Sequence, residues 1–135
     1  IGGLIMKGLV IKCSKCGFAN NLTQDSALIK HKVPFKCDGD TIYLTYFDCE
    51  KCGNRHYVQI DDDETLEYYQ KCYKYMVKLS SAKRNKQTIS QKLNSKFKDL
   101  RAKLNTKRLS LMLEYDGKVI RNGDESSILK FTLTN

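Results

Sequence analysis

The chain has 135 residues, six cysteines and a formal net charge of +9, with 41% hydrophobic and 29% charged residues. This composition is typical of one small globular domain with an appendage and excludes an intrinsically disordered chain. No stretch approaches the ~20 apolar residues of a membrane span, and the N-terminus lacks the basic start and apolar run of a secretion signal. We therefore expect a cytoplasmic protein with no membrane partner, whose reduced cysteines are metal ligands or buried thiols rather than disulfides.

Two cysteine pairs repeat one short pattern. Cys13-x2-Cys16 is followed by Gly17, and Cys49-x2-Cys52 is followed by Gly53. Cysteines spaced in this way on a tight turn direct both sulfurs toward one point, and the glycine can adopt the left-handed backbone that such a turn requires. Two turns of this kind facing each other would complete a tetrahedral zinc site. The alternative is two unrelated pairs of buried cysteines.

The segments around the pairs are rich in β-branched and aromatic residues. "GLVIK" precedes the first pair, and "TIYLTYF" and "HYVQI" flank the second, which indicates a β-hairpin with the cysteines at its tip. Over residues 7–61 this arrangement resembles the zinc-ribbon family. The resemblance implies one structural zinc ion, with Cys13, Cys16, Cys49 and Cys52 as its ligands. The 32-residue gap between the pairs departs from the usual roughly 15–20 residues, but the entropic cost of closing a loop grows slowly with its length.

The remaining histidines and cysteines allow a second scheme with two zinc ions. One site would use Cys13, Cys16, His31 and Cys37, and the other would use Cys49, Cys52, His56 and Cys72. We favour the single site, because four thiolates form a closed, structural centre whose binding energy, about 10–16 kcal/mol, is folding energy. In that case His56 covers the site, Cys72 is a buried thiol on a helix, and Cys37 lies in the core or at the surface.

From Asp61 onward the pattern becomes helical. The acidic run "DDDE" suits a helix N-terminus, and it is followed by apolar residues at helical spacing: Leu66, Tyr69, Cys72 or Tyr73, Met76 and Leu79. A second periodic run extends from Ile89 to Leu104. Thr88-x2-Gln91, at its start, is typical of a capping box. We favour two helices forming a hairpin. A single helix over 63–108 would be ~66 Å long and would require a partner for its apolar stripe, hence a homodimer.

Positive charge is concentrated in this segment. Residues 64–108 contain 13 Lys or Arg against three acids, a net of +10, while the remaining residues hold 11 basic and 12 acidic groups, a net of −1. Since like charges on one helix face repel, a polyanion such as nucleic acid is the expected partner. An acidic protein surface and a solvated face are the alternatives. The candidate contacts are Lys71, Lys74, Lys78, Lys83, Arg84, Lys86, Lys92 and Lys96. Tyrosines at helical spacing beside them are more typical of core and rim than of base stacking.

The C-terminal residues predict a small β element. Leu109, Leu111, Leu113 and Tyr115 occupy every second position, and Asp116–Gly117 then suggests a hairpin turn. "SSILKFTLT" supplies a further strand. The fold class is therefore α+β. We expect zinc-ribbon β-hairpins over 1–61, a basic helical hairpin or long helix over 62–108, and a C-terminal β-hairpin over 109–135.

The motifs that would indicate catalysis are missing from the sequence. It has no phosphate-binding glycine loop, no Ser-His-Asp arrangement and no HExxH, so we do not expect an enzyme. The preferred function is regulatory binding of nucleic acid. One alternative is a protein-interaction module, which looks like the small accessory proteins of bacteria and phages that act on a host polymerase or defence nuclease. The second alternative is an assembly protein that forms homodimers through its helices.

Overall fold

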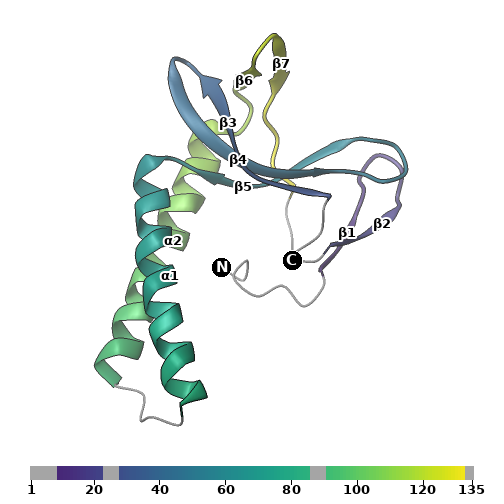
Figure 1. Ribbon diagram of the computed structural model, residues 1–135. Helices are drawn as coiled ribbons and strands as arrows, with labels where there is room; N and C mark the ends of the chain where they lie inside the picture. Colours follow the sequence, from purple (N-terminus) through teal and green to yellow (C-terminus); the bar gives the residue numbers. More distant parts are fainter. Residues whose placement is uncertain (1–8, 23–27, 86–90, 133–135) are drawn as a thin grey trace.

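A computed structural model describes residues 9–22, 28–85 and 91–132. It confirms the α+β class: strands lie before and after two helices. The strands form two antiparallel sheets, one of β1-β2 and one with the order β5-β4-β3-β6-β7. The helix pair and the β1-β2 hairpin extend from opposite ends of the larger sheet (Figure 1). In chain order the elements are β1 (Leu9–Lys12), β2 (Ala19–Leu22), β3 (Ile29–Cys37), β4 (Asp40–Asp48), β5 (Arg55–Asp61), α1 (Asp63–Arg84), α2 (Gln91–Tyr115), β6 (Val119–Asn122) and β7 (Glu125–Ile128).

The strands expected around both cysteine pairs are confirmed. β1 and β2 form one antiparallel hairpin, and β4 and β5 form another, with a cysteine pair at each turn. Apolar side chains from both hairpins and from β3 meet in one buried cluster, Ile11, Leu22, Ile29 and Phe47. Because these side chains leave water together, the small sheet is held against the end of the larger one by burial as well as by any metal.

The main core lies between the larger sheet and the C-terminal end of α2. It contains Phe35, Leu44 and Ile60 from the sheet, together with Tyr115 from the helix. After β7 the chain returns to β5 at the far edge of the sheet, where the N–H of Thr132 donates to the Tyr57 carbonyl at 2.8 Å. The last described residues therefore cover the outer edge of β5.

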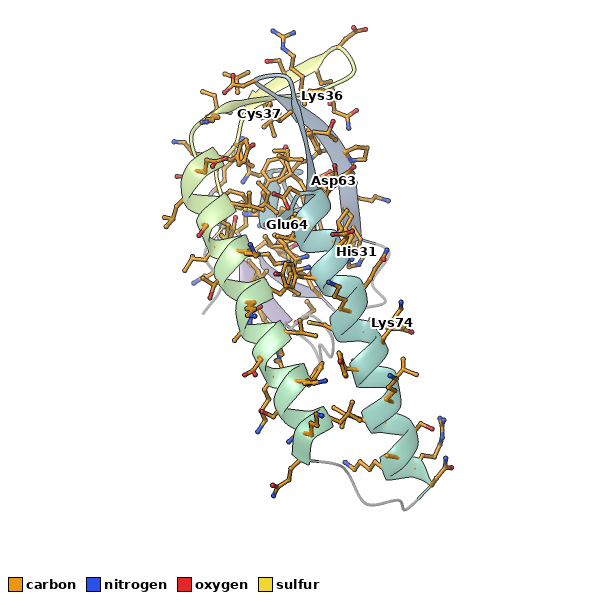
Figure 2. The ribbon with its side chains drawn as sticks, turned by 90° about the vertical axis from the view of Figure 1, so that its left-hand side faces the viewer. His31, Lys36, Cys37, Asp63, Glu64 and Lys74 are labelled. Carbon is orange, nitrogen blue, oxygen red and sulfur yellow. The ribbon has the colours of Figure 1, made fainter. Side chains whose placement is uncertain are left out.

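Two helices, rather than one long helix, form the central segment. Asp62 caps α1: its Oδ1 accepts the Thr65 N–H at 2.8 Å, and the Thr65 hydroxyl oxygen accepts the Asp62 N–H at 2.9 Å. This reciprocal pair confirms the helix start expected at the acidic run. α1 and α2 lie side by side as a hairpin (Figures 1 and 2), which confirms the favoured helical hairpin and rules out the alternative of a single helix over 63–108. The capping box expected at Thr88 lies outside the described residues.

A buried ion pair joins this hairpin to the sheet. Asp61, at the end of β5, is fully buried, and its Oδ1 accepts the Arg108 Nε–H at 2.8 Å and the Thr65 hydroxyl at 2.8 Å. Its Oδ2 accepts the Gln59 amide at 3.1 Å. Arg108 comes from α2 and Thr65 from α1, so a single carboxylate ties both helices to one strand.

The strand expected over 109–115 is wrong, because these residues continue α2. Leu104, Arg108, Leu111 and Tyr115 are spaced by four, three and four residues, so they share one helix face, and that face points into the core. Leu109 and Leu113 face solvent instead. The domain boundary expected at residue 108 therefore falls inside α2.

The Asp116–Gly117 turn ends this helix rather than joining two strands. Gly117 has φ +84°, and its N–H donates to the Leu129 carbonyl at 2.7 Å. This left-handed glycine is a common helix terminator. The expected C-terminal hairpin does form, but later in the chain, as β6 and β7 around Gly123.

Within the residues that the structure describes, neither helix is long and apolar enough to cross a bilayer.

Candidate metal centre

The two cysteine turns, here called the first knuckle (residues 13–18) and the second knuckle (residues 49–54), have the same backbone structure. In the first, the Cys13 N–H donates to the Phe18 carbonyl at 2.9 Å, and the Gly17 N–H donates to the Cys13 carbonyl at 2.8 Å. In the second, the equivalent bonds are Cys49 to Asn54 at 2.9 Å and Gly53 to Cys49 at 2.8 Å. The glycines have φ +78° and +77°, in the left-handed region that glycine adopts without steric cost.

This equivalence extends beyond the knuckles to the strands. Each residue of the first hairpin corresponds to the residue 36 positions later, since Cys13 corresponds to Cys49. The cross-strand pair Ile11–Asn20 therefore corresponds to Phe47–His56, and both pairs are directly opposite in their hairpins. Ile11 and Phe47 also meet in the same buried cluster. The two hairpins form an internal structural repeat, with the cysteines where the two copies meet.

The four sulfurs form one compact group. Cys13 Sγ lies 3.6 Å from Cys52 Sγ, and Cys16 Sγ lies 3.6 Å from Cys49 Sγ. All four sulfurs lie within 4.8 Å of one another. A tetrahedron with zinc–sulfur bonds of ~2.3 Å has sulfurs about 3.8 Å apart, so the donor atoms and their spacing fit one zinc ion. The cysteine prediction from the sequence is confirmed as a possible four-cysteine metal site.

Nearby N–H donors lower the pKa values of the cysteine thiols, whereas the close approach of four sulfurs opposes the ionisation of all four at once. The Cys52 N–H, followed by the amide of Asn20, lowers the pKa of Cys49 to about 6 in spite of burial. The Phe18 N–H favours the Cys16 thiolate, but burial and the neighbouring sulfurs raise the pKa of Cys16 to about 12. Four thiolates thus repel one another without a cation, and a divalent metal can replace the protons that the group retains.

The scheme with two zinc ions is wrong, because the structure brings the two cysteine pairs together. Cys37 is buried in the main core and Cys72 is buried on α1. His31 lies on β3 well away from Cys37 (Figure 2). Among the described residues, the four knuckle cysteines are the only group of metal-ligating side chains close enough to hold an ion.

His56 lies close in sequence to the second knuckle but has its own partners. Its ring stacks on Phe47 with the ring centroids 4.9 Å apart. Its Nδ1 lies 3.0 Å from the Thr132 hydroxyl oxygen. Burial lowers the pKa of His56, so the neutral ring is favoured in the folded protein. It is a packed side chain of the repeat and not a member of the sulfur group.

The acidic run at the start of α1 has structural roles. Asp61 holds Arg108, and Asp62 caps the helix. Asp63 accepts a hydrogen bond from the Tyr43 hydroxyl at 3.1 Å, and Glu64 pairs with Lys107 at 2.8 Å. These contacts agree with the interpretation of the run as a helix start.

The candidate basic residues are distributed over more than one face of the hairpin. Lys74 is on the side of α1 turned away from α2 (Figure 2), and Lys83 and Arg84 are exposed in its last turn. Lys86 lies outside the described residues. By helical spacing, Lys71 and Lys78 share one face of α1, and Lys92 and Lys96 share one face of α2.

Tyrosines and two further lysines complete these two faces. The Tyr68 ring lies between Lys71 of α1 and Lys107 of α2, whose Nζ atoms are 5.6 and 5.4 Å from its centroid. Lys78 Nζ lies 5.5 Å from the Tyr75 centroid. On α2, Lys103 is one turn from Lys107 and Lys96 about three turns. We define the Lys–Tyr face as Tyr68, Lys71, Tyr75, Lys78, Lys92, Lys96, Lys103 and Lys107.

The sequence identified one contribution only in part and missed another. Lys103 and Lys107 were assigned to one row with Lys92 and Lys96 by their spacing, but they were not included among the candidate contacts. The contact of Asn20 with a cysteine sulfur was not predicted. The 36-residue repeat, which aligns Asn20 with His56, is the sequence signal that could have identified it.

No protein-family model, curated protein or solved structure matches this chain significantly.

Proposed function

We propose that this protein is a non-catalytic nucleic-acid-binding protein, built on a zinc-ribbon-like frame, whose contact surface is the Lys–Tyr face. One observation carries the proposal: the two antiparallel helices, α1 and α2, bring lysines from both helices to one side of the hairpin, around two tyrosine rings. The metal in this proposal is zinc, since four thiolates at tetrahedral spacing are typical of structural zinc sites. Cysteine ligands of this kind require a reducing compartment such as the cytoplasm.

The charge of the hairpin supports a polyanionic partner. Within the described residues, Lys107 and Arg108 are the only basic side chains of α1 and α2 that form an ion pair. The other lysines of the Lys–Tyr face are exposed, and each lies within a turn or two of another. A phosphate backbone would relieve this repulsion and release counterions.

The tyrosines add a second kind of contact. Tyr68 and Tyr75 are half-buried, so their rings are held by the hairpin while part of each remains accessible. Aromatic rings between cations are suited to nucleobases, which stack on any aromatic face without regard to sequence. The proposal therefore predicts nucleic-acid binding with strong salt dependence and little sequence specificity.

Fluorescence anisotropy with labelled duplex DNA, single-stranded DNA and structured RNA tests this function. Zinc-loaded wild-type protein is compared with K78E/K96E on the Lys–Tyr face and with K83E/K98E, a control with the same charge change, one exposed residue per helix, off that face by helical spacing. We expect the face variant to bind at least tenfold more weakly, with the slope of log affinity against log salt reduced by about 2. The control should change affinity less than threefold.

Two results would count against the proposal. No binding to any of the probes near ~100 mM salt would eliminate nucleic acid as the partner. Equal weakening in both variants would mean that net charge, rather than the Lys–Tyr face, attracts the probe.

A protein partner is the second candidate. Leu109 and Leu113 are one turn apart on α2 and are 56% and 77% exposed. Exposed leucines arranged in this way are typical of helix faces that bind other proteins. In that case L109S/L113S would abolish capture of a partner and leave nucleic-acid affinity unchanged. Helix-mediated homodimerisation stays a prediction, although its argument from a single long helix no longer applies, because α1 and α2 pack against each other.

A further inference from the structure

We propose that Asn20 is a positioning residue of the metal centre, which holds the Cys49 sulfur and the second knuckle in place from the first hairpin. The inference rests on the proposed metal centre and concerns a residue outside its four ligands.

The contacts of Asn20 connect the two halves of the repeat. The side chain is fully buried on β2, and its Nδ2 lies 3.5 Å from Cys49 Sγ. The same nitrogen lies 3.4 Å from the carbonyl oxygens of Ile11 and of Phe18. Its Oδ1 accepts the Glu50 N–H, in the turn of the second knuckle, at 3.0 Å. One amide thus satisfies its own hydrogen-bonding groups while linking a strand, the first knuckle and the second knuckle.

Only one of the two hairpins provides such a contact, although the repeat gives both an equivalent position. His56 has the position equivalent to Asn20, but its Nδ1 interacts with Thr132, a residue of the C-terminal segment. Its Nε2 is buried and has no partner among the described residues. A side-chain donor from the opposite hairpin therefore reaches Cys49, whereas the equivalent cysteine, Cys13, receives none from His56.

A donor at this position has a defined electrostatic effect. Four thiolates around a divalent cation leave a net negative charge, and an N–H aimed at one sulfur disperses part of it. The same bond fixes the direction of the Cys49 side chain before metal arrives, which lowers the cost of assembling the site from two separate hairpins. Asn20 should therefore increase metal affinity, although it is not a ligand.

Competition with a chromophoric zinc chelator measures this contribution. Asn20→Asp keeps the side-chain size and an acceptor for the Glu50 N–H, but it replaces the donor beside Cys49 with a carboxylate oxygen. We expect zinc affinity to fall about 10–100-fold, as for other groups that orient metal ligands. Asn21→Asp makes the same change at the exposed neighbouring position and should alter affinity less than twofold. Equal affinities for the two variants would overturn the proposal.

A measurement on the wild-type protein does not depend on how the variant folds. With ¹¹³Cd²⁺ in place of zinc, NMR should show scalar coupling between an Asn20 side-chain amide proton and the metal, transmitted through the Cys49 sulfur. Absence of this coupling in a cadmium-loaded protein would overturn the role of Asn20 while leaving the metal centre intact. A wild-type protein that bound neither zinc nor cadmium would instead refute the metal centre itself, and the Asn20 proposal with it.

Discussion

Replacing Arg108 with methionine tests the buried connection between the helical hairpin and the sheet. Arg108 Nε lies 2.8 Å from Asp61 Oδ1, and the two side chains are 8% and 0% exposed. Methionine keeps much of the apolar volume but removes the cation, so the Asp61 carboxylate would remain buried with only Thr65 and Gln59 as donors. We therefore expect a large loss of stability.

The magnitude follows from burial rather than from distance. Removing one partner of a buried ion pair costs about 3–5 kcal/mol, because the remaining charge loses its hydrogen-bonded counterion in a low-dielectric environment. The half-buried Lys32 also attracts the Asp61 carboxylate and would compensate part of its charge. The adjacent residue provides the matched control: Lys107 Nζ lies at the same 2.8 Å from Glu64, but those side chains are 36% and 58% exposed. Lys107→Met should cause little or no measurable loss, since water already solvates both charges.

Equilibrium unfolding in urea at saturating zinc gives both values. The double variant Asp61→Asn/Arg108→Met should lose less than the sum of the single variants, because it leaves no unpaired charge. A loss below about 1 kcal/mol for Arg108→Met, as for a surface pair, would refute the reasoning. So would equal losses for Arg108→Met and Lys107→Met.

Three further predictions follow from the repeat and its surroundings. Gly53→Ala should cost about 1–2 kcal/mol in urea unfolding, because its φ of +77° is left-handed. Apart from the two neighbouring residues, no atom lies within 4 Å of the added Cβ, so the backbone conformation accounts for the cost. No loss would mean that the backbone is not left-handed. Burial lowers the pKa of His56 below its ordinary 6.5, so the free energy of unfolding should decrease as the pH falls from 6.5 through the lower pKa of the folded protein. His56→Gln should reduce the loss of stability between pH ~7.5 and ~5.5. Equal losses in the variant and the wild type would contradict a role for His56. Removing metal with a chelator should speed amide hydrogen exchange in β1 and β2 while α1 and α2 keep their protection, and a loss of helix protection would indicate that the hairpin also depends on the metal.

The sequence was most informative where the structure is local. Each knuckle is specified by two cysteines and a glycine within five residues, so its turn could be predicted without knowledge of the rest of the chain. The pairing of the two knuckles across the 32-residue gap was inferred from their repetition, and the close approach of all four sulfurs confirms it. The start of α1 was equally local, because Asp62 and Thr65 form the cap between themselves.

Contacts between distant residues limited the prediction. Arg108 was counted as one basic residue among many, and only the fold shows that it pairs with Asp61, 47 positions earlier. The same contact explains why residues 109–115 are helical: their alternating leucines suit a strand, but burial of Arg108, Leu111 and Tyr115 on one face favours continuation of the helix. The apolar residues do recur at every second position, but tertiary packing, rather than this spacing, determines the secondary structure here.

Metal content and coordination test the central claim most directly, namely that two equivalent hairpins are joined by one centre of four cysteines. Native mass spectrometry of the purified protein, combined with X-ray absorption at the zinc edge, gives the number of ions and the identity of their ligands. We predict one zinc ion per chain, surrounded by four sulfurs at ~2.3 Å. Two zinc ions, or a shell containing histidine nitrogen, would contradict it.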